Sequence, residues 1–393
     1  MLTFVLLLIG SVSMQAQVPY EFPTFSIKKF ESYMAPAVKV IENGEVVTDV
    51  IVAVYLGNQI RGIAQPFPEE DVCYPSVYGL YEEEDEKLHF KIYANGHLVE
   101  VAPDDFILEL DTDYGTPKNP KVIDITDISK TIDLLDQDDN TQTLEKNHAY
   151  LADVTLKDRT LYKDGDWNTL CLPFAVSKEA LADEKHPFHG ATIMELDTEG
   201  TYKDNEKTGY DEDKETLYLY FKEVSSIAAG VPYLIKWAKA DDYDSADPAT
   251  RDLVSPVLKG VTIDQSDDAK ASMTTTSKDG NVSFVGTNAP TDVAAGEQSM
   301  LFMGSGNSLY KQHVDKGGVF RSQRAYFQLN GNAANARMVV MNLDENETTD
   351  IISMEDVRSK TSDVWYTLSG VKLNCKPNTK GVYINNGKKV YIK

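Results

Sequence analysis

Residues 164–174 read DGDWNTLCLPF, and residues 230–237 read GVPYLIKW. Each stretch is a nearly continuous apolar run bounded by Gly, Asp or Pro. A short run of this kind is typical of a β-strand that is buried on both faces. The stretch FRSQRAYFQL at residues 320–329 repeats the pattern. These runs predict a central β-rich domain over residues 149–346.

The rest of the central domain follows the same pattern. ATIMEL, LYLYFKEV, VSFVGT and MLFMG supply further strands, and VSKEALADEKH at residues 176–186 is the best helix candidate. Helical signals are otherwise scarce. The domain is therefore predicted to be mostly β, with one short helix.

Residues 25–122 contain short alternating runs separated by turn signals. Asn43-Gly44 and Asn95-Gly96 each lie between two such runs. Asn-Gly favours a type I′ hairpin because both residues can adopt positive φ. An N-terminal β-sandwich module is predicted here, and the polar residues 123–148 are predicted to be a linker. The fold class is thus all-β, with tandem antiparallel sandwich-like modules, at most one or two short helices and a small C-terminal β unit.

The N-terminus is predicted to carry an export signal. An apolar run from Leu2 to Ile9 precedes GSVSMQAQ, which predicts a signal peptide over residues 1–16. No Lys or Arg precedes the run, so Met1 need not be the true start. Spanning a bilayer takes about 20 apolar residues, and no later segment approaches that length. No transmembrane segment is predicted.

The C-terminal segment, residues 351–393, is predicted to form a small β unit. Its last part, KGVYINNGKKVYIK, places two strands around Asn386-Gly387. We expect a hairpin in which alternation brings four apolar residues to one face. These residues are Val382, Ile384, Val390 and Ile392.

The tail resembles the C-terminal sorting domains of the type IX secretion system in Bacteroidetes. The resemblance rests on LSG at residues 368–370, on Gly381 and on the basic ending GKKVYIK. The preceding modules resemble β-rich domains of exported Bacteroidetes proteins. The resemblance implies that export machinery reads residues 351–393 and that the protein is secreted or held on the outer cell surface. If the hairpin only completes the preceding fold, the periplasm is the expected location.

Composition excludes one class of partner. The chain has 62 acidic and 38 basic side chains, a formal charge of -24, which repels the phosphates of nucleic acids. Cys73, Cys171 and Cys375 are odd in number and widely spaced, so they form no disulfide framework. Cys171 lies in an apolar run and is predicted to be a buried, inert thiol.

No catalytic, cofactor-binding or metal-binding residue is assigned from sequence, and the chain is predicted not to be an enzyme. The chain contains no G-x-S-x-G, H-E-x-x-H or phosphate-binding glycine loop. Asp136, Asp138 and Asn140 have the first spacings of a calcium loop, but the turn glycine is missing and Asn147 replaces the bidentate Glu. We therefore expect a solvated turn there.

The remaining candidates also have plainer interpretations. His186 and His189 have no third ligand at diagnostic spacing, which predicts a surface loop. The tryptophans could stack on sugars, but strand alternation predicts that they are core residues. Arg321 and Arg324 could bind a carboxylate ligand, although pairing with the acidic surface is the simpler expectation. The tryptophans are Trp167, Trp237 and Trp365.

These features predict a noncatalytic exported surface or extracellular protein that presents a binding or adhesive surface. Its expected partners are the export machinery and a host or bacterial surface protein or glycan. The alternative is a glycan-processing enzyme or its carbohydrate-binding accessory module. A third possibility is a structural piece of a surface assembly, with an exposed edge strand that accepts a partner strand.

Overall fold

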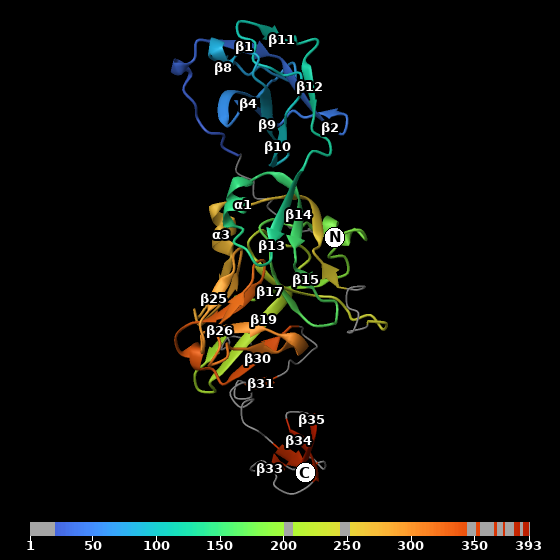
Figure 1. The fold of residues 1–393 in the computed structure, drawn as a ribbon, viewed down its shortest axis with the longest axis vertical. Helices are drawn as coiled ribbons and strands as arrows, with labels where there is room; N and C mark the ends of the chain where they lie inside the picture. Colours follow the sequence, from blue (N-terminus) through green and yellow to red (C-terminus); the bar gives the residue numbers. More distant parts are fainter. Residues whose placement is uncertain are drawn as a thin grey trace, which may run out of the picture. The chain divides into compact units, whose positions relative to one another are not determined.

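The computed structural model describes residues 20–199, 207–243 and 252–343, and the strand residues 351–353, 365–367, 372–373, 381–385 and 388–392 (Figure 1). The predicted signal peptide lies outside these residues. The chain divides into two compact units. Unit 1 comprises Met1–Lys130 and Ala149–Ala152, and unit 2 comprises Thr131–His148 and Asp153–Lys393.

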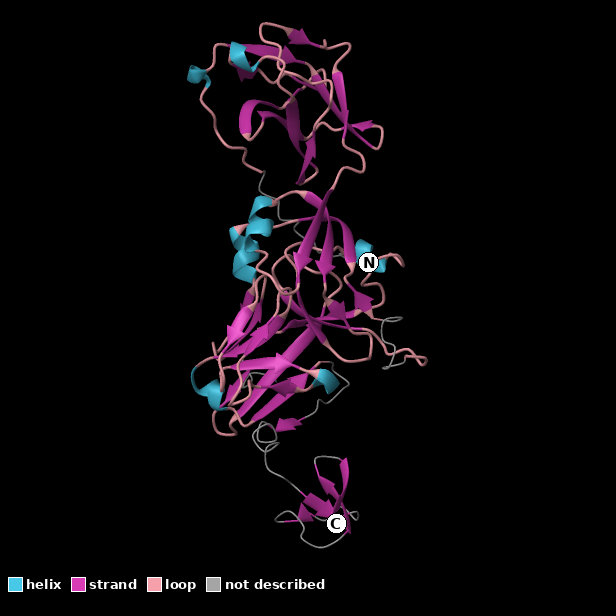
Figure 2. Ribbon diagram, viewed as in Figure 1, coloured by secondary structure: helices cyan, strands magenta, loops and turns pink. Residues whose placement is uncertain are grey.

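The all-β class is confirmed, and strands dominate the ribbon (Figure 2). The described residues contain three short α-helices, one more than expected: α1 (Thr141–Lys146), α2 (Lys178–Ala182) and α3 (Asp267–Ser272). Helix α2 lies within the predicted helical stretch. It begins where the Ser177 hydroxyl accepts a hydrogen bond from the Ala180 amide. No helix in the described part of the chain is long and apolar enough to cross a membrane.

The described residues of unit 1 form three sheets and two 3₁₀ turns, η1 (Ile27–Lys29) and η2 (Tyr81–Glu83). The first sheet has the order β11 (Asp113–Tyr114), β1 (Ser32–Pro36), β8 (Val77–Gly79). The second has the order β10 (His97–Val101), β9 (Leu88–Ala94), β4 (Val50–Leu56), β5 (Gln59–Ala64). The third has the order β12 (Lys121–Asp124), β2 (Val38–Glu42), β7 (Val72–Cys73), β6 (Pro66–Phe67), with β3 (Glu45–Val46) beside β2.

The Asn-Gly turns of unit 1 form as predicted. Asn43 and Gly44 have φ of 52° and 81°, and Asn95 and Gly96 have φ of 51° and 84°. The β2–β3 and β9–β10 registers leave only these dipeptides in the loops. The inward residues of the strands then share one core, in which Phe90 stacks on Phe106 at 4.5 Å.

The main part of unit 2 is a sandwich of two sheets. One sheet has the order β16 (Asn168–Cys171), β20 (Pro232–Lys236), β17 (Thr192–Leu196), β19 (Thr216–Glu223), β30 (Met338–Asn342), β31 (Ile351–Ser353), with β18 (Gly209–Asp211) beside β19. The other has the order β23 (Thr274–Thr276), β24 (Val282–Gly286), β29 (Ala325–Leu329), β26 (Met300–Met303), β27 (Leu309–Tyr310).

Smaller pairings and turns complete the described part of unit 2. Strands β13 (Lys130–Leu135), β14 (Leu151–Lys157) and β22 (Val257–Thr262) form a sheet. Two ribbons pair β15 (Thr160–Leu161) with β21 (Leu253–Val254), and β25 (Thr291–Val293) with β28 (Gly318–Phe320). Two 3₁₀ segments are η4 (Ser305–Asn307) and η5 (Gly331–Asn335). The stretch predicted to be a linker, residues 123–148, contains β13 and α1.

Aromatic side chains join the two layers of the sandwich. Phe221 of β19 meets Phe284 and Phe327 of the facing sheet edge-on, with ring centroids 6.0 and 6.2 Å apart. Phe284 and Phe327 stack at 4.5 Å. All residues of β16 and four of the five in β20 are buried, as their continuous apolar sequences predicted. Of the stretches that decided the fold, β16 forms the end of one sheet with β20 beside it, and β29 lies between β24 and β26 in the other.

The C-terminal hairpin also forms, with β34 (Gly381–Asn385) antiparallel to β35 (Lys388–Ile392) in a sheet with β32 (Trp365–Thr367) and β33 (Lys372–Leu373). The expected alignment of apolar residues is wrong. The register opposes Val382 to Tyr391 and Tyr383 to Val390. A two-residue loop pairs even-numbered with odd-numbered positions, so the even-numbered residues of the two strands belong to opposite faces.

We predict that Phe327→Ala lowers the free energy of unfolding of unit 2 by about 3–5 kcal/mol, because it opens a cavity where two sheets meet. Urea unfolding followed by tryptophan fluorescence measures the change. Val319→Ala is the control, since Val319 is 60% exposed and its loss should cost less than about 0.5 kcal/mol. Equal midpoints for the two variants would contradict the assigned core.

Candidate functional site

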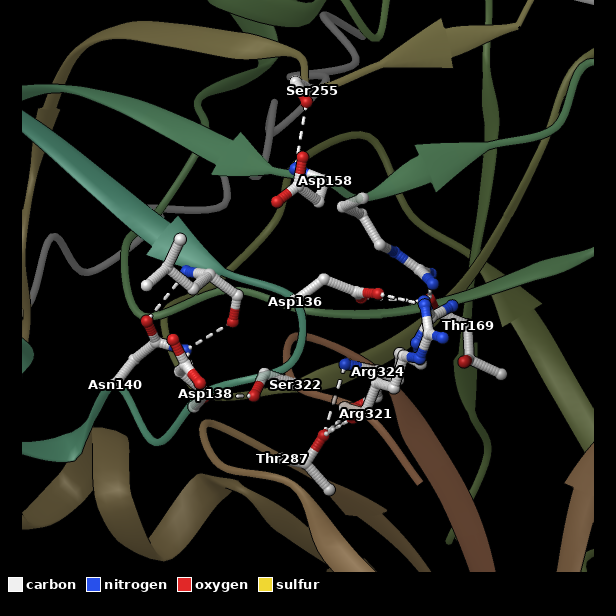
Figure 3. Close-up of polar contacts among 12 residues, drawn as sticks. Asp136, Asp138, Asn140, Asp158, Thr169, Ser255, Thr287, Arg321, Ser322 and Arg324 are labelled. Atoms are coloured by element: carbon white, nitrogen blue, oxygen red, sulfur yellow. Dashed lines mark hydrogen bonds and ion pairs between the residues drawn. The ribbon is translucent and has the colours of Figure 1, made fainter. Parts of the chain in front are cut away.

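A polar cluster in unit 2 surrounds Asp136 (Figure 3). Its side chain is 0% exposed. Oδ2 accepts a hydrogen bond from Arg321 Nη1 at 2.9 Å, and Oδ1 accepts one from Arg324 Nη2 at 2.7 Å. The expected pairing of both arginines with the acidic surface is therefore wrong, because Asp136 is buried. The expected turn is present and residues 137–139 are exposed, but Asp136 itself is not solvated. The calcium-loop candidate Asp136 and the carboxylate-binding candidates Arg321 and Arg324 bind each other.

Backbone hydrogen bonds hold this carboxylate in place. The Asp136 amide donates to Lys157 O at 3.0 Å, and the Ser322 amide donates to Asp136 O at 3.0 Å. The Ser322 hydroxyl donates to Asp138 O at 2.8 Å. Residues on both sides of Asp136 are thus tied to the turn that carries the arginines.

Asn140, the third residue of the calcium-like spacing, stabilises the same turn. Asn140 is 3% exposed, and its amide oxygen accepts from the Leu135 amide at 2.8 Å. Its Nδ2 donates to Leu135 O and Asp138 O, each at 2.9 Å. The described residues contain no group of three His, Cys, Asp or Glu side chains placed to hold a metal. Asp136, Asp138 and Asn140 therefore form a turn. The buried carboxylate of this turn, that of Asp136, is ion-paired.

A third arginine of unit 2 is buried near the same backbone. Arg159 is 1% exposed and donates from Nη2 to Thr169 O at 2.7 Å. The amide of Cys171, which lies two residues after Thr169 in β16, donates to Gln323 O. Burial lowers the pKa of Arg324, an effect that Asp136 opposes. Asp136 has both carboxylate oxygens paired, whereas Nε and Nη1 of Arg159 are buried without a hydrogen-bond partner among the described residues.

The other sequence candidates lie as expected where they are described. His186 and His189 occupy a surface loop, where His186 Nδ1 accepts from the Phe188 amide at 3.1 Å. Trp167 and Trp237 are 6% and 5% exposed, so they are core residues. Cys171 is buried, and desolvation raises its pKa to about 12. The side chains of Trp365 and Cys375 lie outside the described residues.

An exposed aromatic group on unit 1 was missed. Tyr33 of β1 lies opposite Tyr78 of β8 in the antiparallel register, with ring centroids 5.5 Å apart. Tyr33 is 49% exposed, whereas its neighbour Met34 is buried. Phe30 lies nearly parallel to Tyr78 at 6.4 Å. We call Phe30, Tyr33 and Tyr78 the Tyr33 cluster.

A buried arginine, ion-paired with the partly exposed Glu83, supports the Tyr33 cluster from one side. Arg61 is 3% exposed, and its guanidinium carbon lies 4.7 Å from the centre of the Phe30 ring. Its two terminal nitrogens donate to the two carboxylate oxygens of Glu83 at 2.6 and 2.7 Å. Arg61 Nη1 also donates to Tyr78 O at 3.5 Å. A bidentate pair of this kind fixes the guanidinium plane on which Phe30 rests.

Alternation alone could have placed Tyr33 and Tyr78 on outward positions of their strands. It could not have paired them, because that requires the register between two distant strands. Comparison of the chain with models of known protein families, with curated proteins and with solved structures found no match.

We predict that Asp136→Ala lowers the free energy of unfolding of unit 2 by about 3 kcal/mol, the low end of the range for breaking a buried pair, because Arg321 remains partly solvated. Thermal and urea unfolding measure the loss. Asp138→Ala is the matched control, because that side chain is exposed. If both variants unfold like the native protein, the cluster is not structural.

The Arg61–Glu83 pair should make unit 1 sensitive to acid. The hydrogen bonds from Arg61 hold the pKa of Glu83 below its ordinary value of 4.5. Because the pKa of Glu83 is lower in the folded than in the unfolded chain, its carboxylate stabilises the fold at pH values above the unfolded-state pKa. This stabilisation is lost as the pH falls through the lowered pKa of the folded state. We expect Glu83→Gln to flatten the decline in stability from pH 5 to pH 3, measured by urea unfolding. Glu82→Gln should keep the native slope, and equal slopes for both variants would refute the assignment.

Proposed function

We propose that this chain is a noncatalytic exported surface or extracellular protein in which the Tyr33 cluster is the binding face. The observation that carries the proposal is the cross-strand pair Tyr33–Tyr78, in which Tyr33 is 49% exposed on a sheet with a buried underside. Exposed aromatic side chains on a rigid support are characteristic of recognition surfaces.

The Asp136 cluster and the Tyr33 cluster differ in how accessible they are to a ligand, and this difference supports the choice of the Tyr33 cluster. The Asp136 cluster has both carboxylate oxygens paired inside the fold. The Tyr33 cluster has Phe30 and Tyr78 partly exposed, with Tyr33 exposed on the same group of rings. A ligand can reach the second without breaking an ion pair.

The proposed location rests on sequence features at both ends. The apolar run from Leu2 to Ile9 supports export, and the resemblance of residues 351–393 to type IX sorting domains supports delivery to the surface or medium. We propose that export machinery reads this tail. The tail then acts as an address and the Tyr33 cluster as the binding surface.

Truncation tests the address. Because β31 (Ile351–Ser353) pairs with β30 in the main sheet of unit 2, the truncated chain should end at Ser353 and lose only residues 354–393. We expect the full chain in the medium or on the surface and the truncated chain in the periplasm, located by fractionation and immunoblot. If both chains stop in the same compartment, the tail is not an address.

Adhesion tests the binding face. The purified full chain should be retained on mucin-coated or collagen-coated wells, and Tyr33→Ala should reduce retention at least roughly tenfold, as for the loss of a central aromatic contact. Tyr310→Ala in unit 2 is the matched control, because Tyr310 is 43% exposed. Failure of the native chain to bind either surface, or equal retention of Tyr33→Ala, would overturn the proposal.

A further inference from the structure

We infer that Arg159 and Gln323 of unit 2 enclose a binding site for a chloride ion. Among the described residues, seven buried side-chain nitrogen and oxygen atoms have no hydrogen-bond partner. Five of the seven lie in unit 2, two on Arg159, two on Gln323 and one on Asn288. Buried polar atoms are normally paired, so a group of exceptions indicates a small bound molecule or ion.

Backbone hydrogen bonds bring Arg159 and Gln323 to the same edge of β16. Arg159 Nη2 donates to Thr169 O at 2.7 Å, and the Cys171 amide donates to Gln323 O at 3.4 Å. Alternate residues of a strand direct their backbone groups to the same edge. β16 is the end strand of its sheet, and β20 lies on its other edge. The guanidinium of Arg159 and the backbone of Gln323 therefore follow one another along the edge that faces away from β20.

The turn that carries Gln323 buries an unpaired amide at a cost in backbone strain. Gln323 has φ of 52°, a conformation that only glycine adopts freely. Its backbone amide donates to Thr287 O at 2.7 Å. The residue is 0% exposed, and both Nε2 and Oε1 lack a partner among the described residues. A strained residue whose buried side chain is unpaired points to a ligand at that side chain.

The charge of Arg159 favours an anion over water. Arg159 is 1% exposed. Nε and Nη1 have no partner and Nη2 donates to a carbonyl, so no carboxylate of the described residues accepts a hydrogen bond from this guanidinium. Arginine stays protonated in proteins, whereas a buried lysine can lose its charge. An unpaired buried charge is far costlier than an unpaired amide, and a water molecule would leave that charge uncompensated.

The neighbouring charges also favour an anion. The backbone amide of Asp136 donates to Lys157 O, two residues before Arg159. Both carboxylate oxygens of Asp136 are already bound by Arg321 and Arg324 (Figure 3). Three arginines and one buried carboxylate thus meet in this part of unit 2.

Burial selects chloride among the anions. A divalent oxyanion loses more hydration on burial than a monovalent ion does, and it needs more donors around it. Chloride is small and accepts from the N–H groups of Arg159 and from Gln323 Nε2, while Gln323 Oε1 accepts from a water beside the ion. The formal charge of -24 repels anions at long range, but salt screens that repulsion over about 8 Å. The local excess of arginine therefore decides.

Thermal unfolding of the full chain at constant ionic strength tests the inference in solution. Gluconate is too large for a closed site, so the Tm of unit 2 should be about 2–4 °C higher in chloride than in gluconate when chloride is at about five times its Kd. Arg159→Met should lose this difference. Arg337→Met should keep it, because Arg337 is 65% exposed and paired with Glu215. No difference for the native chain, or equal differences for both variants, would overturn the inference.

Gln323→Glu provides a second variant that does not remove the arginine. Its carboxylate replaces the ion as the partner of Arg159, so the variant should unfold at the same temperature in chloride and in gluconate. Circular dichroism confirms that each variant is folded. A Gln323→Glu protein with the native chloride effect would show that Gln323 lies outside the site and would contradict the assignment.

Bromide locates the ion directly in the native chain. Because the site is closed, the protein is refolded and crystallised in bromide, which replaces chloride and scatters anomalously. We expect an anomalous peak in contact with the guanidinium of Arg159. Peaks confined to surface side chains would refute the site. A peak at Arg159 without a chloride effect on Tm would mean binding at crystal concentration only, which also refutes it.

Discussion

The ion pairing of Asp136 inside unit 2 is the constraint on which the path of the chain depends. The chain passes between its two units at residues 130/131, 148/149 and 152/153. The first segment to enter unit 2 is fixed by Arg321 and Arg324, which lie 185 and 188 positions later. In unit 1, Glu100 has the same role, because it accepts from Tyr150 Oη at 3.2 Å and pairs with Lys130 at 3.3 Å. Each unit thus holds its crossing segment with a carboxylate. Loss of the fully buried Asp136 should cost more than loss of Glu100, whose side chain is 34% exposed.

The success of sequence-based prediction followed the range of the interactions. Asn43-Gly44 and Asn95-Gly96 formed the expected hairpins because the φ angles of adjacent residues are a local matter. The apolar runs that became β16 and β20 were recognised because burial on both faces leaves a mark in consecutive residues. Asp136 was not recognised as buried, because its arginines lie in a distant part of the sequence. A charged residue is normally expected at the surface unless its partner is known.

The missed Tyr33 cluster and the misaligned C-terminal hairpin share one physical cause. Alternation within a strand says which residues share a face of that strand, but not which face of the neighbour they meet. At β1 and β8 the register brings Tyr33 beside Tyr78. At β34 and β35 the two-residue loop sets Val382 against Tyr391. The register between two strands depends on tertiary structure, so it cannot be predicted from the pattern of residues within one strand.

The chain places its charges and its aromatic rings in an unusual relation. Arg61 and Asp136 are buried and paired, whereas Tyr33, a side chain that gains by burial, remains half exposed. Arg61 joins the two features, because the same guanidinium that binds Glu83 also lies against Phe30 of the Tyr33 cluster. Holding Phe30 in this way costs the desolvation of an ion pair and leaves Tyr33 in water. Our proposal that Tyr33 serves recognition is consistent with this arrangement, because Met34 and Val77 fill the core beneath the two tyrosines and strand alternation leaves Tyr33 on the outer face.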